Sequence, residues 1–361
     1  MEVINQYNRR VDHERQPRPS FRLILRGQRT SRNTAPFESS SHCETPHTPN
    51  PVHVTMPSDN VSAATRLRNR LKTTDDLILL PGVYDGFSAR IALGVGFDGL
   101  YMTGAGTSAS RLGLPDLGFA TLNDMRSHAE MLASLDPSVP LVADADTGYG
   151  GPNQVARTVT QYAQSGVAGL HIEDQVQTKR CGHLTGKEVV DVEVFAARIK
   201  AAKLAREKIG SDIVVIARTD ALQTHGFDEA LNRLRAAIAA GADVAFLEGV
   251  RTEEQAREAC KALAPTPVLL NMVEHASTPS WTAGQAKDIG FRMMIVPFAS
   301  IAPAYEAMRD SLTRLKETGV VGTQPDFTPR KLFSIVGLDQ AMEFDAAAGG
   351  TSYSQVKDAT N

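Results

Sequence analysis

Residues 140–150 read Pro-Leu-Val-Ala-Asp-Ala-Asp-Thr-Gly-Tyr-Gly, an apolar run that ends in two carboxylates and a glycine-rich turn. A continuous apolar run of this length, without polar alternation, is typical of a parallel strand that is covered on both faces. Runs of the same kind recur along the chain. Together they occupy residues 77–84, 99–103, 140–146, 169–174, 213–220, 244–249, 267–273 and 291–298.

Amphipathic stretches separate these runs, for example at residues 193–208, 227–240 and 252–263. In the second of them, Asp228 is the expected N-cap and Gly241 the expected stop. Alternation of eight strands with helices over about 250 residues predicts a (β/α)8 barrel. A doubly wound sheet is the alternative, but it needs a complete glycine-rich dinucleotide turn, and Gly104-Ala105-Gly106 lacks the rest of that fingerprint.

Length and composition fit one barrel with tails. The chain has 361 residues, of which 42% are hydrophobic, and its formal net charge is −3. This charge predicts no special affinity for nucleic acid or membrane, and no apolar run approaches the roughly 20 residues that span a bilayer. The cysteines, Cys43, Cys181 and Cys260, are scattered, which suits a reducing compartment rather than a disulfide framework.

The amino-terminal segment differs from the rest of the chain. Residues 1–57 are rich in arginine and then in Ser, Thr and Pro, and they lack apolar periodicity, so we expect a disordered leader. A mitochondrial transit peptide is one interpretation; a tail without function, or a true start at Met56, is the other. We therefore expect a cytoplasmic enzyme, with a mitochondrial location as the alternative. The barrel domain is expected at residues 58–350, followed by a flexible tail at 351–361.

Catalytic groups of a barrel lie at the carboxyl ends of its strands. Polar residues follow the apolar runs at nearly every such end. They include Asp85, Thr103, Asp144, Asp146, Glu173, Arg218, Glu248 and Asn271, and Pro297 follows the last run. A helix cap or a solvated loop residue would explain any single one of them, but it explains the whole set poorly.

Asp144, Asp146 and Glu173 form an expected acidic cluster. The two aspartates are two positions apart at a strand end, so both should point the same way. Converging carboxylates repel unless a cation lies among them, and oxygen ligands favour Mg2+ or Mn2+ over Zn2+. His171 lies in mid-strand and is expected to be buried and hydrogen-bonded rather than a ligand.

Arg218 and Asn271 are candidates for binding a substrate carboxylate. The guanidinium of Arg218 suits this role because it can bind two oxygens at once. A structural pair of Arg218 with Glu248 or Asp220 is the alternative, and both roles can coexist.

Lys179-Arg180-Cys181-Gly182-His183 places a thiol next to three basic side chains. Cations favour the thiolate, so we expect a lowered pKa for Cys181. Gly182 allows a close approach or a hinge. Taken alone, this loop suits a nucleophile, a redox sensor or a proton donor.

The set of motifs together resembles the isocitrate lyase/phosphoenolpyruvate mutase superfamily. They are Tyr101-Met-Thr103-Gly104-Ala105, Pro115-Asp116, Asp144-Ala-Asp146-Thr-Gly-Tyr-Gly, His171-Ile-Glu173-Asp, Lys179-Arg-Cys181-Gly182-His183 and Arg218-Thr-Asp. The resemblance covers about residues 74–350. It implies a (β/α)8 barrel whose carboxy-terminal helix is exchanged between subunits of a homotetramer, a dimer of dimers.

The resemblance also implies roles for individual residues. Mg2+, or Mn2+, would be held by Asp144, Asp146 and Glu173. Substrate would be bound by Thr103, Gly104, Ala105, Asp116, Gly182, Arg218, Glu248, Asn271 and Pro297. The catalytic set would be Cys181, Tyr101, Lys179, His183 and Glu173, and the loop at residues 179–183 would close as a lid.

The cysteine loop favours the carbon–carbon lyase branch, since phosphonate-forming mutases of the superfamily lack that cysteine. Pro297 stands where oxaloacetate hydrolases carry a serine, which favours a lyase. The expected reaction is Mg2+-dependent cleavage of a 2-hydroxy di- or tricarboxylate, of 2,3-dimethylmalate or 2-methylisocitrate type, to a 2-oxo acid and a carboxylic acid. Cys181 is the expected general acid, and Tyr101 or a metal-linked group the base.

Three alternatives stay open at this point. The first is an oxaloacetate acetylhydrolase that gives oxalate and acetate, the second an inactive dicarboxylate-binding barrel, and the third a phosphonomutase-like enzyme. In each case the expected partner is a small carboxylate, with no nucleic acid and no membrane.

Overall fold

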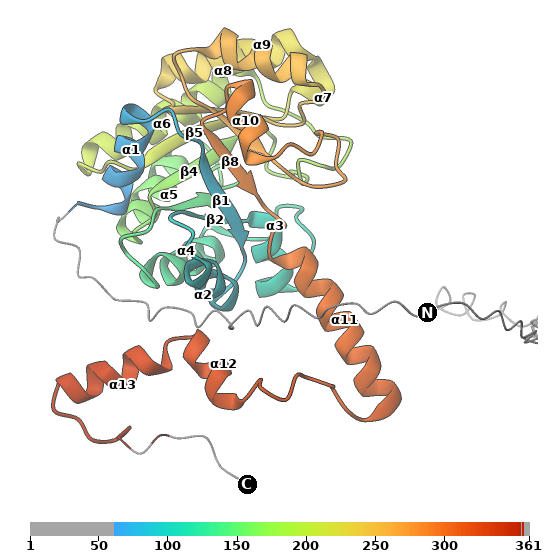
Figure 1. Cartoon of the computed structure of the whole chain (residues 1–361). Coiled ribbons are helices and arrows are strands. Elements are labelled where there is room, and N and C mark those ends of the chain that lie inside the picture. Colours follow the sequence, from blue (N-terminus) through green and yellow to red (C-terminus); the bar gives the residue numbers. More distant parts are fainter. Residues whose placement is uncertain (1–60, 355, 357–361) are drawn as a thin grey trace, which may run out of the picture. The chain divides into compact units, whose positions relative to one another are not determined.

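The computed structural model describes residues 61–354 and 356, and it contains a closed barrel of eight parallel strands in sequence order (Figure 1). The strands are β1 (Ile78–Val83), β2 (Leu100–Met102), β3 (Leu141–Asp144), β4 (Gly169–Glu173), β5 (Val214–Thr219), β6 (Val244–Leu247), β7 (Val268–Asn271) and β8 (Met293–Val296). Each falls within one of the predicted runs. The (β/α)8 prediction is confirmed.

The strands pair in a register that brings their carboxyl ends to one rim. Glu173 at the end of β4 lies opposite Arg218 on β5, and Pro81 on β1 pairs with Val296 on β8 to close the barrel. Nearly all strand residues are buried, because side chains fill the barrel on one face and helices cover the other.

Alternate strand residues form the packed interior. Leu80, Val142, Ile216 and Phe246 belong to one buried cluster inside the barrel, and Leu67 joins the same cluster. Leu67 comes from helix α1 (Ala63–Thr73), which therefore packs on the barrel interior. Burying one such leucine side chain stabilises the fold by about 1.5–3 kcal/mol.

Helices follow the strands around the barrel (Figure 1). They are α2 (Gly86–Val95), α3 (Gly104–Thr107), the π-helix η1 (Ser108–Leu112), α4 (Leu122–Ser134), α5 (Pro152–Gln164), α6 (Val192–Lys208), α7 (Leu222–His225), α8 (Phe227–Ala240), α9 (Glu253–Leu263), α10 (Ala283–Ile289), α11 (Ile301–Thr318), α12 (Pro329–Ile335) and α13 (Leu338–Ala347). The three predicted helices match α6, α8 and α9. Gly241 ends α8 as expected, but the prediction of Asp228 as N-cap was wrong, since α8 begins after Gly226 and Asp228 lies in its first turn.

One local prediction about the acidic strand end was also wrong. Strand β3 ends at Asp144, and Asp146 has a left-handed backbone with φ of 46°. Strand alternation therefore does not reach Asp146, and the side chains of Asp144 and Asp146 do not project as i and i+2 partners of one strand.

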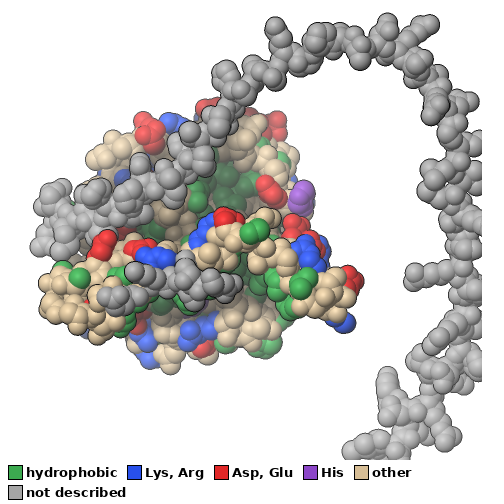
Figure 2. Space-filling model, turned by 60° about the horizontal axis from the view of Figure 1, so that its bottom comes forward, with side chains coloured by type: hydrophobic (Ala, Val, Ile, Leu, Met, Phe, Trp, Pro, Cys, Tyr) green, Lys and Arg blue, Asp and Glu red, His purple; other side chains and the backbone are tan. Residues whose placement is uncertain are grey.

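The carboxy-terminal helices have no buried residues in the single chain. None of the described residues of α11, α12 and α13 is buried, and apolar side chains are exposed there and elsewhere on the surface (Figure 2). On these helices they are Tyr305, Met308, Leu312, Leu315, Leu332, Phe333 and Phe344. Exchange of the last helix between subunits stays a prediction. The predicted leader lies outside the described residues, as does most of the predicted tail. Across the described helices, none combines the length and apolar character needed to cross a bilayer.

Candidate active site

Buried polar side chains gather at the carboxyl rim of the barrel. Asp144 ends β3, Glu173 ends β4, Arg218 lies near the end of β5, Glu248 follows β6 and Asn271 ends β7. Parallel strands bring these ends to one side, so the predicted residues are neighbours there. A buried polar group is costly unless it is paired, which makes this rim a functional candidate.

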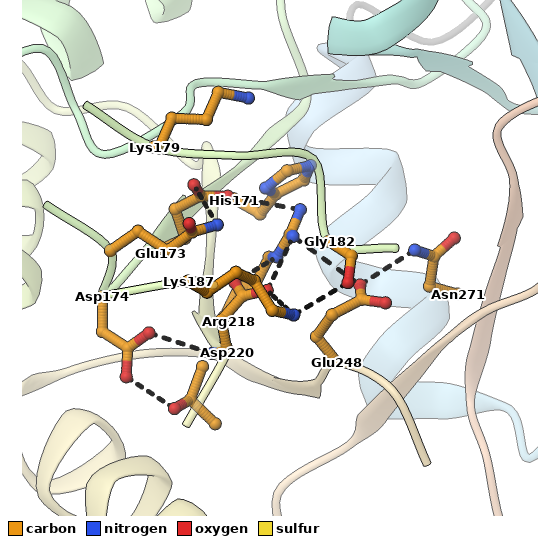
Figure 3. A network of polar contacts seen from close by, with 12 residues as sticks. His171, Glu173, Asp174, Lys179, Gly182, Lys187, Arg218, Asp220, Glu248 and Asn271 are labelled. Atoms are coloured by element: carbon orange, nitrogen blue, oxygen red, sulfur yellow. Dashed lines mark hydrogen bonds and ion pairs between the residues drawn. The ribbon is translucent and has the colours of Figure 1, made fainter. Parts of the chain in front are cut away.

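Arg218 is the centre of a network of carboxylates (Figure 3). Its guanidinium donates to Asp220 over 2.9 and 3.1 Å, and it pairs with Glu173 over 3.2 Å and with Glu248 over 3.8 Å. Although burial opposes it, these carboxylates hold the pKa of Arg218 well above its usual range. The predicted structural pairs of Arg218 are therefore present, and its planar fork is fixed in place at the rim.

The cysteine loop lies directly on this network. A Cβ added to Gly182 would lie 2.4 Å from Nη2 of Arg218 and 2.8 Å from Cδ of Glu248, so only glycine fits there. On the other side of the thiol, the backbone N–H of Cys181 donates to the carbonyl of Asp116 over 3.1 Å. The backbone on both sides of the thiol is thereby fixed, at Asp116 on one side and at Arg218 and Glu248 on the other.

The expected lowering of the Cys181 pKa was wrong. Burial raises the pKa of the thiol, and the carboxylate of Asp116 adds to the effect. The basic neighbours in sequence are not effective partners in space: Lys179 is held by carboxylates, the Arg180 side chain pairs with a surface glutamate, and burial lowers the pKa of His183, which favours its neutral form. The thiol form of Cys181 is therefore favoured at neutral pH.

Lys179 serves the acidic cluster rather than the thiol. Its ammonium is buried, lies 2.5 Å from Oδ1 of Asp146 and donates to Asp116. Although burial opposes it, these carboxylates raise the pKa of Lys179 well above the usual range. Lys179 therefore ties the start of the cysteine loop to the ends of two neighbouring strand–loop segments.

Tyr101 is buried in the barrel and bonded to His171. The phenol oxygen lies 2.9 Å from Nε2 of His171, whose pKa burial lowers to about 3. The prediction of a buried, hydrogen-bonded His171 is confirmed. Burial raises the pKa of Tyr101 well above its usual value, and the nearby Asp144 adds to the effect. The phenol therefore stays protonated and is not available to accept a proton.

The remaining predicted contacts lie at the same rim. Thr103 caps α3 through its hydroxyl, Gly104 and Ala105 form its first turn, and Pro297 is buried directly after β8. A Cβ at Gly104 would lie 2.2 Å from Oδ2 of Asp144, so the absence of a side chain leaves room beside that carboxylate.

Several buried polar atoms near Arg218 have no hydrogen-bond partner among the described residues. They are Nδ1 of His183, Oε1 of Glu248 and Oδ1 of Asn271. The other amide atom of Asn271 donates to Glu248 over 2.9 Å and lies 3.4 Å from Nε2 of His183. Unpaired buried atoms in one small area are typical of a site that a polar ligand completes.

A comparison with known families matches residues 67–316 to the family described as phosphoenolpyruvate phosphomutase, which covers more than half of the chain. The chain belongs to the PEP mutase/isocitrate lyase family. The resemblance inferred from its motifs is thereby confirmed.

Relatives within the PEP mutase/isocitrate lyase family include lyases. The structure of a 2,3-dimethylmalate lyase is similar with a TM-score of 0.82 and 58% identity, covering 83% of this chain and 100% of the other. An oxaloacetate acetylhydrolase in complex with 3,3-difluorooxalacetate follows with a TM-score of 0.79 and 57% identity, covering 81% and 98%. The 2-methylisocitrate lyase of Bacillus subtilis is 38% identical over 74% of this chain and 86% of its own length. The chain is a carbon–carbon lyase of this family.

The PEP mutase/isocitrate lyase family implies a divalent metal ion at the acidic cluster. Among the described side chains, no three His, Cys, Asp or Glu groups surround one point as they stand. Mg2+ is usually bound by only one or two carboxylates with water and substrate oxygens, however, and Asp144 and Asp146 supply those oxygens. Burial raises the pKa of Asp146 to about 7 and also raises those of Asp144 and Glu173, although the nearby Lys179 opposes the rise. The donor set fits a small divalent cation.

Sequence reasoning missed three residues that hold the site together. Gln175 donates to Glu173 and to the carbonyl of Arg180, both over 2.9 Å, and Asp174 accepts from the backbone N–H of Asp220. Lys187 bonds both to the cysteine loop and to Asp220. Asp174 ends the motif that starts at His171, but no local pattern gives a role to any of the three residues, because their partners become neighbours only when the barrel closes.

Proposed function

We propose that this PEP mutase/isocitrate lyase family member cleaves a 2-hydroxy dicarboxylate, of 2,3-dimethylmalate type, to a 2-oxo acid and a carboxylic acid, with Cys181 as general acid and Mg2+ as cofactor. The observation that carries the proposal is a protonated thiol in the residue next to the glycine that contacts Arg218. Gly182 packs on that guanidinium, and burial raises the pKa of the neighbouring Cys181.

Substrate binding would use the residues at the rim. Arg218 offers a fixed guanidinium to a carboxylate, and Asn271 and His183 have unpaired polar atoms beside it. Asp144 and Asp146 would hold Mg2+, with Glu173 nearby. When bound, that ion would supply a Lewis acid for the 2-hydroxyl and its adjacent carboxylate.

The chemical step balances with these groups. A base removes the proton of the 2-hydroxyl, the carbon–carbon bond breaks, and its electron pair stays with the leaving enolate. The Cys181 thiol donates its proton to the enolate carbon, and the resulting thiolate is reprotonated from solvent. Arg218 would stabilise the developing negative charge. Burial makes Tyr101 a weak candidate for the base.

A second candidate is the hydrolysis of oxaloacetate to oxalate and acetate, which the similarity to the structure of an oxaloacetate acetylhydrolase supports. Pro297 follows β8 directly, and a pyrrolidine ring has no hydroxyl to bind a hydrated ketone. For that reason we favour the lyase reaction.

The decisive assay offers Mg2+ with 2,3-dimethylmalate, 2-methylisocitrate and oxaloacetate in parallel. We expect a 2-oxo acid from one of the hydroxy acids at a kcat/KM well above the rate of oxalate release. Faster release of oxalate from oxaloacetate would favour the hydrolase, and no metal-dependent turnover would reject both.

We also propose a homo-oligomer in which a second copy covers the apolar side chains of α11 to α13. The absence of buried residues on these helices supports it. Light scattering after size-exclusion chromatography should give a mass several times that of the 361-residue chain. Truncation before α11 should reduce that mass to the monomer's.

A further inference from the structure

Lys187 is a buried cation outside every group of residues that the sequence nominated. Its side chain is 1% exposed. Its ammonium donates to the carbonyl of Gly182 over 2.8 Å and to Oδ1 of Asp220 over 2.7 Å (Figure 3). A buried lysine is rare unless it is paired, so these two contacts explain why the charge is retained there.

Asp220, whose carboxylate accepts a hydrogen bond from Lys187, also accepts hydrogen bonds from Arg218. Asp220 accepts two hydrogen bonds from the guanidinium, and its own backbone N–H donates to Asp174 over 2.9 Å. Although burial opposes it, Arg218 and Lys187 lower the pKa of Asp220 to about 2, so this carboxylate stays ionised. Asp220 is therefore a fixed anchor, and Lys187 connects it to the cysteine loop.

Gly182 depends on this connection because it has no side chain of its own to hold it. Its α-carbon lies against Arg218 and Glu248, and its carbonyl receives the charged hydrogen bond from Lys187. Hydrogen bonds from an ionised donor are roughly twice as strong as neutral ones. Removal of the ammonium would leave the backbone just after Cys181 without this anchor.

We propose that Lys187 is a positioning residue, whose ammonium latches the Cys181–Gly182 segment onto the Arg218–Asp220 pair. In the latched loop Cys181 is partly buried, and in the released loop its thiol is open to solvent. The catalytic meaning of this latch rests on the proposed function. The latch itself does not, since it is defined by contacts within the protein.

The experiment measures the rate at which iodoacetamide alkylates Cys181, resolved by peptide mass spectrometry and without substrate. Lys187→Met removes the charge at similar length, Lys187→Arg keeps it, and Lys261→Met on the exposed face of α9 is the matched control. Cys260, on the same helix, is the internal reference. We expect Cys181 to react about tenfold faster in Lys187→Met, with Cys260 and the control unchanged.

Lys187→Arg should react more slowly than Lys187→Met, because it retains a charged donor. Equal rates in the two variants would assign the effect to lost packing and overturn the latch, as would a wild-type rate in a folded Lys187→Met protein. If Lys187→Met does not fold by circular dichroism, Lys187→Gln carries the same test: faster alkylation of Cys181 supports the latch, and a wild-type rate overturns it.

Activity gives a second, separable readout. In Lys187→Met we expect kcat to fall about tenfold or more while KM changes by less than about threefold, since the binding residues stay in place. A rise in KM at constant kcat would contradict a role in placing the thiol. If the wild-type enzyme turns over none of the proposed substrates, the proposed function fails, while the alkylation rates still test the latch.

Discussion

Gly182 packs against the guanidinium of Arg218 so closely that a Cβ at position 182 would lie 2.4 Å from Nη2. Arg218 cannot yield easily, because Asp220 and Glu173 hold it from the sides. The cysteine loop can approach Arg218 and Glu248 this closely because position 182 lacks a side chain. The contact between these two residues fixes the backbone next to Cys181.

Replacement of Gly182 by alanine should therefore displace the loop. We expect Gly182→Ala to lower kcat by about 100-fold, as is typical when a reacting group is misplaced by about 1 Å. Gly94→Ala is the matched control, because Gly94 is helical and a Cβ there meets nothing within 4 Å. Steady-state kinetics of both variants check this. Similar kcat values in the two would show that the close contact has no role.

The raised pKa of Cys181 predicts an unusual pH profile for its alkylation. Only the thiolate reacts, and burial holds the pKa above the ordinary value of 9.0. The rate constant should therefore still be rising with pH above 9 rather than levelling off below 8. Peptide-resolved alkylation between pH 6 and 10 measures it, with urea-unfolded protein as the reference. A plateau below pH 8 would restore the low pKa that the sequence had predicted.

Metal binding should depend on pH through Asp146. Burial raises the pKa of this carboxyl to about 7, and it must lose its proton before it can bind a cation. Affinity for Mg2+ should thus fall as the pH drops below about 7, by up to about tenfold per unit, and level off above it. Isothermal titration in buffers of different ionisation enthalpy should detect proton release. Constant affinity from pH 5.5 to 8 would contradict this role of Asp146.

Asp174 should contribute to stability rather than to chemistry. It accepts hydrogen bonds from Thr219 over 2.6 Å and from Arg233 over 3.2 Å in a fully buried position. Asp174→Asn should lower the free energy of unfolding by about 3 kcal/mol, since it breaks a buried ion pair. Urea unfolding measures this, with the exposed Asp228→Asn as control. Equal midpoints for the two variants would show that the pair is not stabilising.

The barrel could be predicted from the sequence because its strands are continuous apolar runs of similar length. The same runs indicated which residues lie at the carboxyl rim, and Arg218, Glu248 and Asn271 were found there. These features depend on local composition and on a regular repeat, and both can be recognised in the amino-acid sequence.

Other features depend on turns and on contacts between distant residues. Asp146 leaves the strand pattern because its backbone is left-handed. Burial raises the pKa of Cys181, and Lys179, two positions earlier, points to Asp116 and Asp146 rather than to the thiol. Lys187 meets Asp220 across 33 positions of sequence, a contact that no local pattern predicts.

The central claim is that Cys181 donates the proton to the leaving enolate, and Cys181→Ala tests it most directly. With Mg2+ and the best substrate of the panel, we expect the turnover of the variant to fall by about 100-fold or more while substrate still binds with near wild-type affinity. Wild-type turnover by Cys181→Ala would contradict the account.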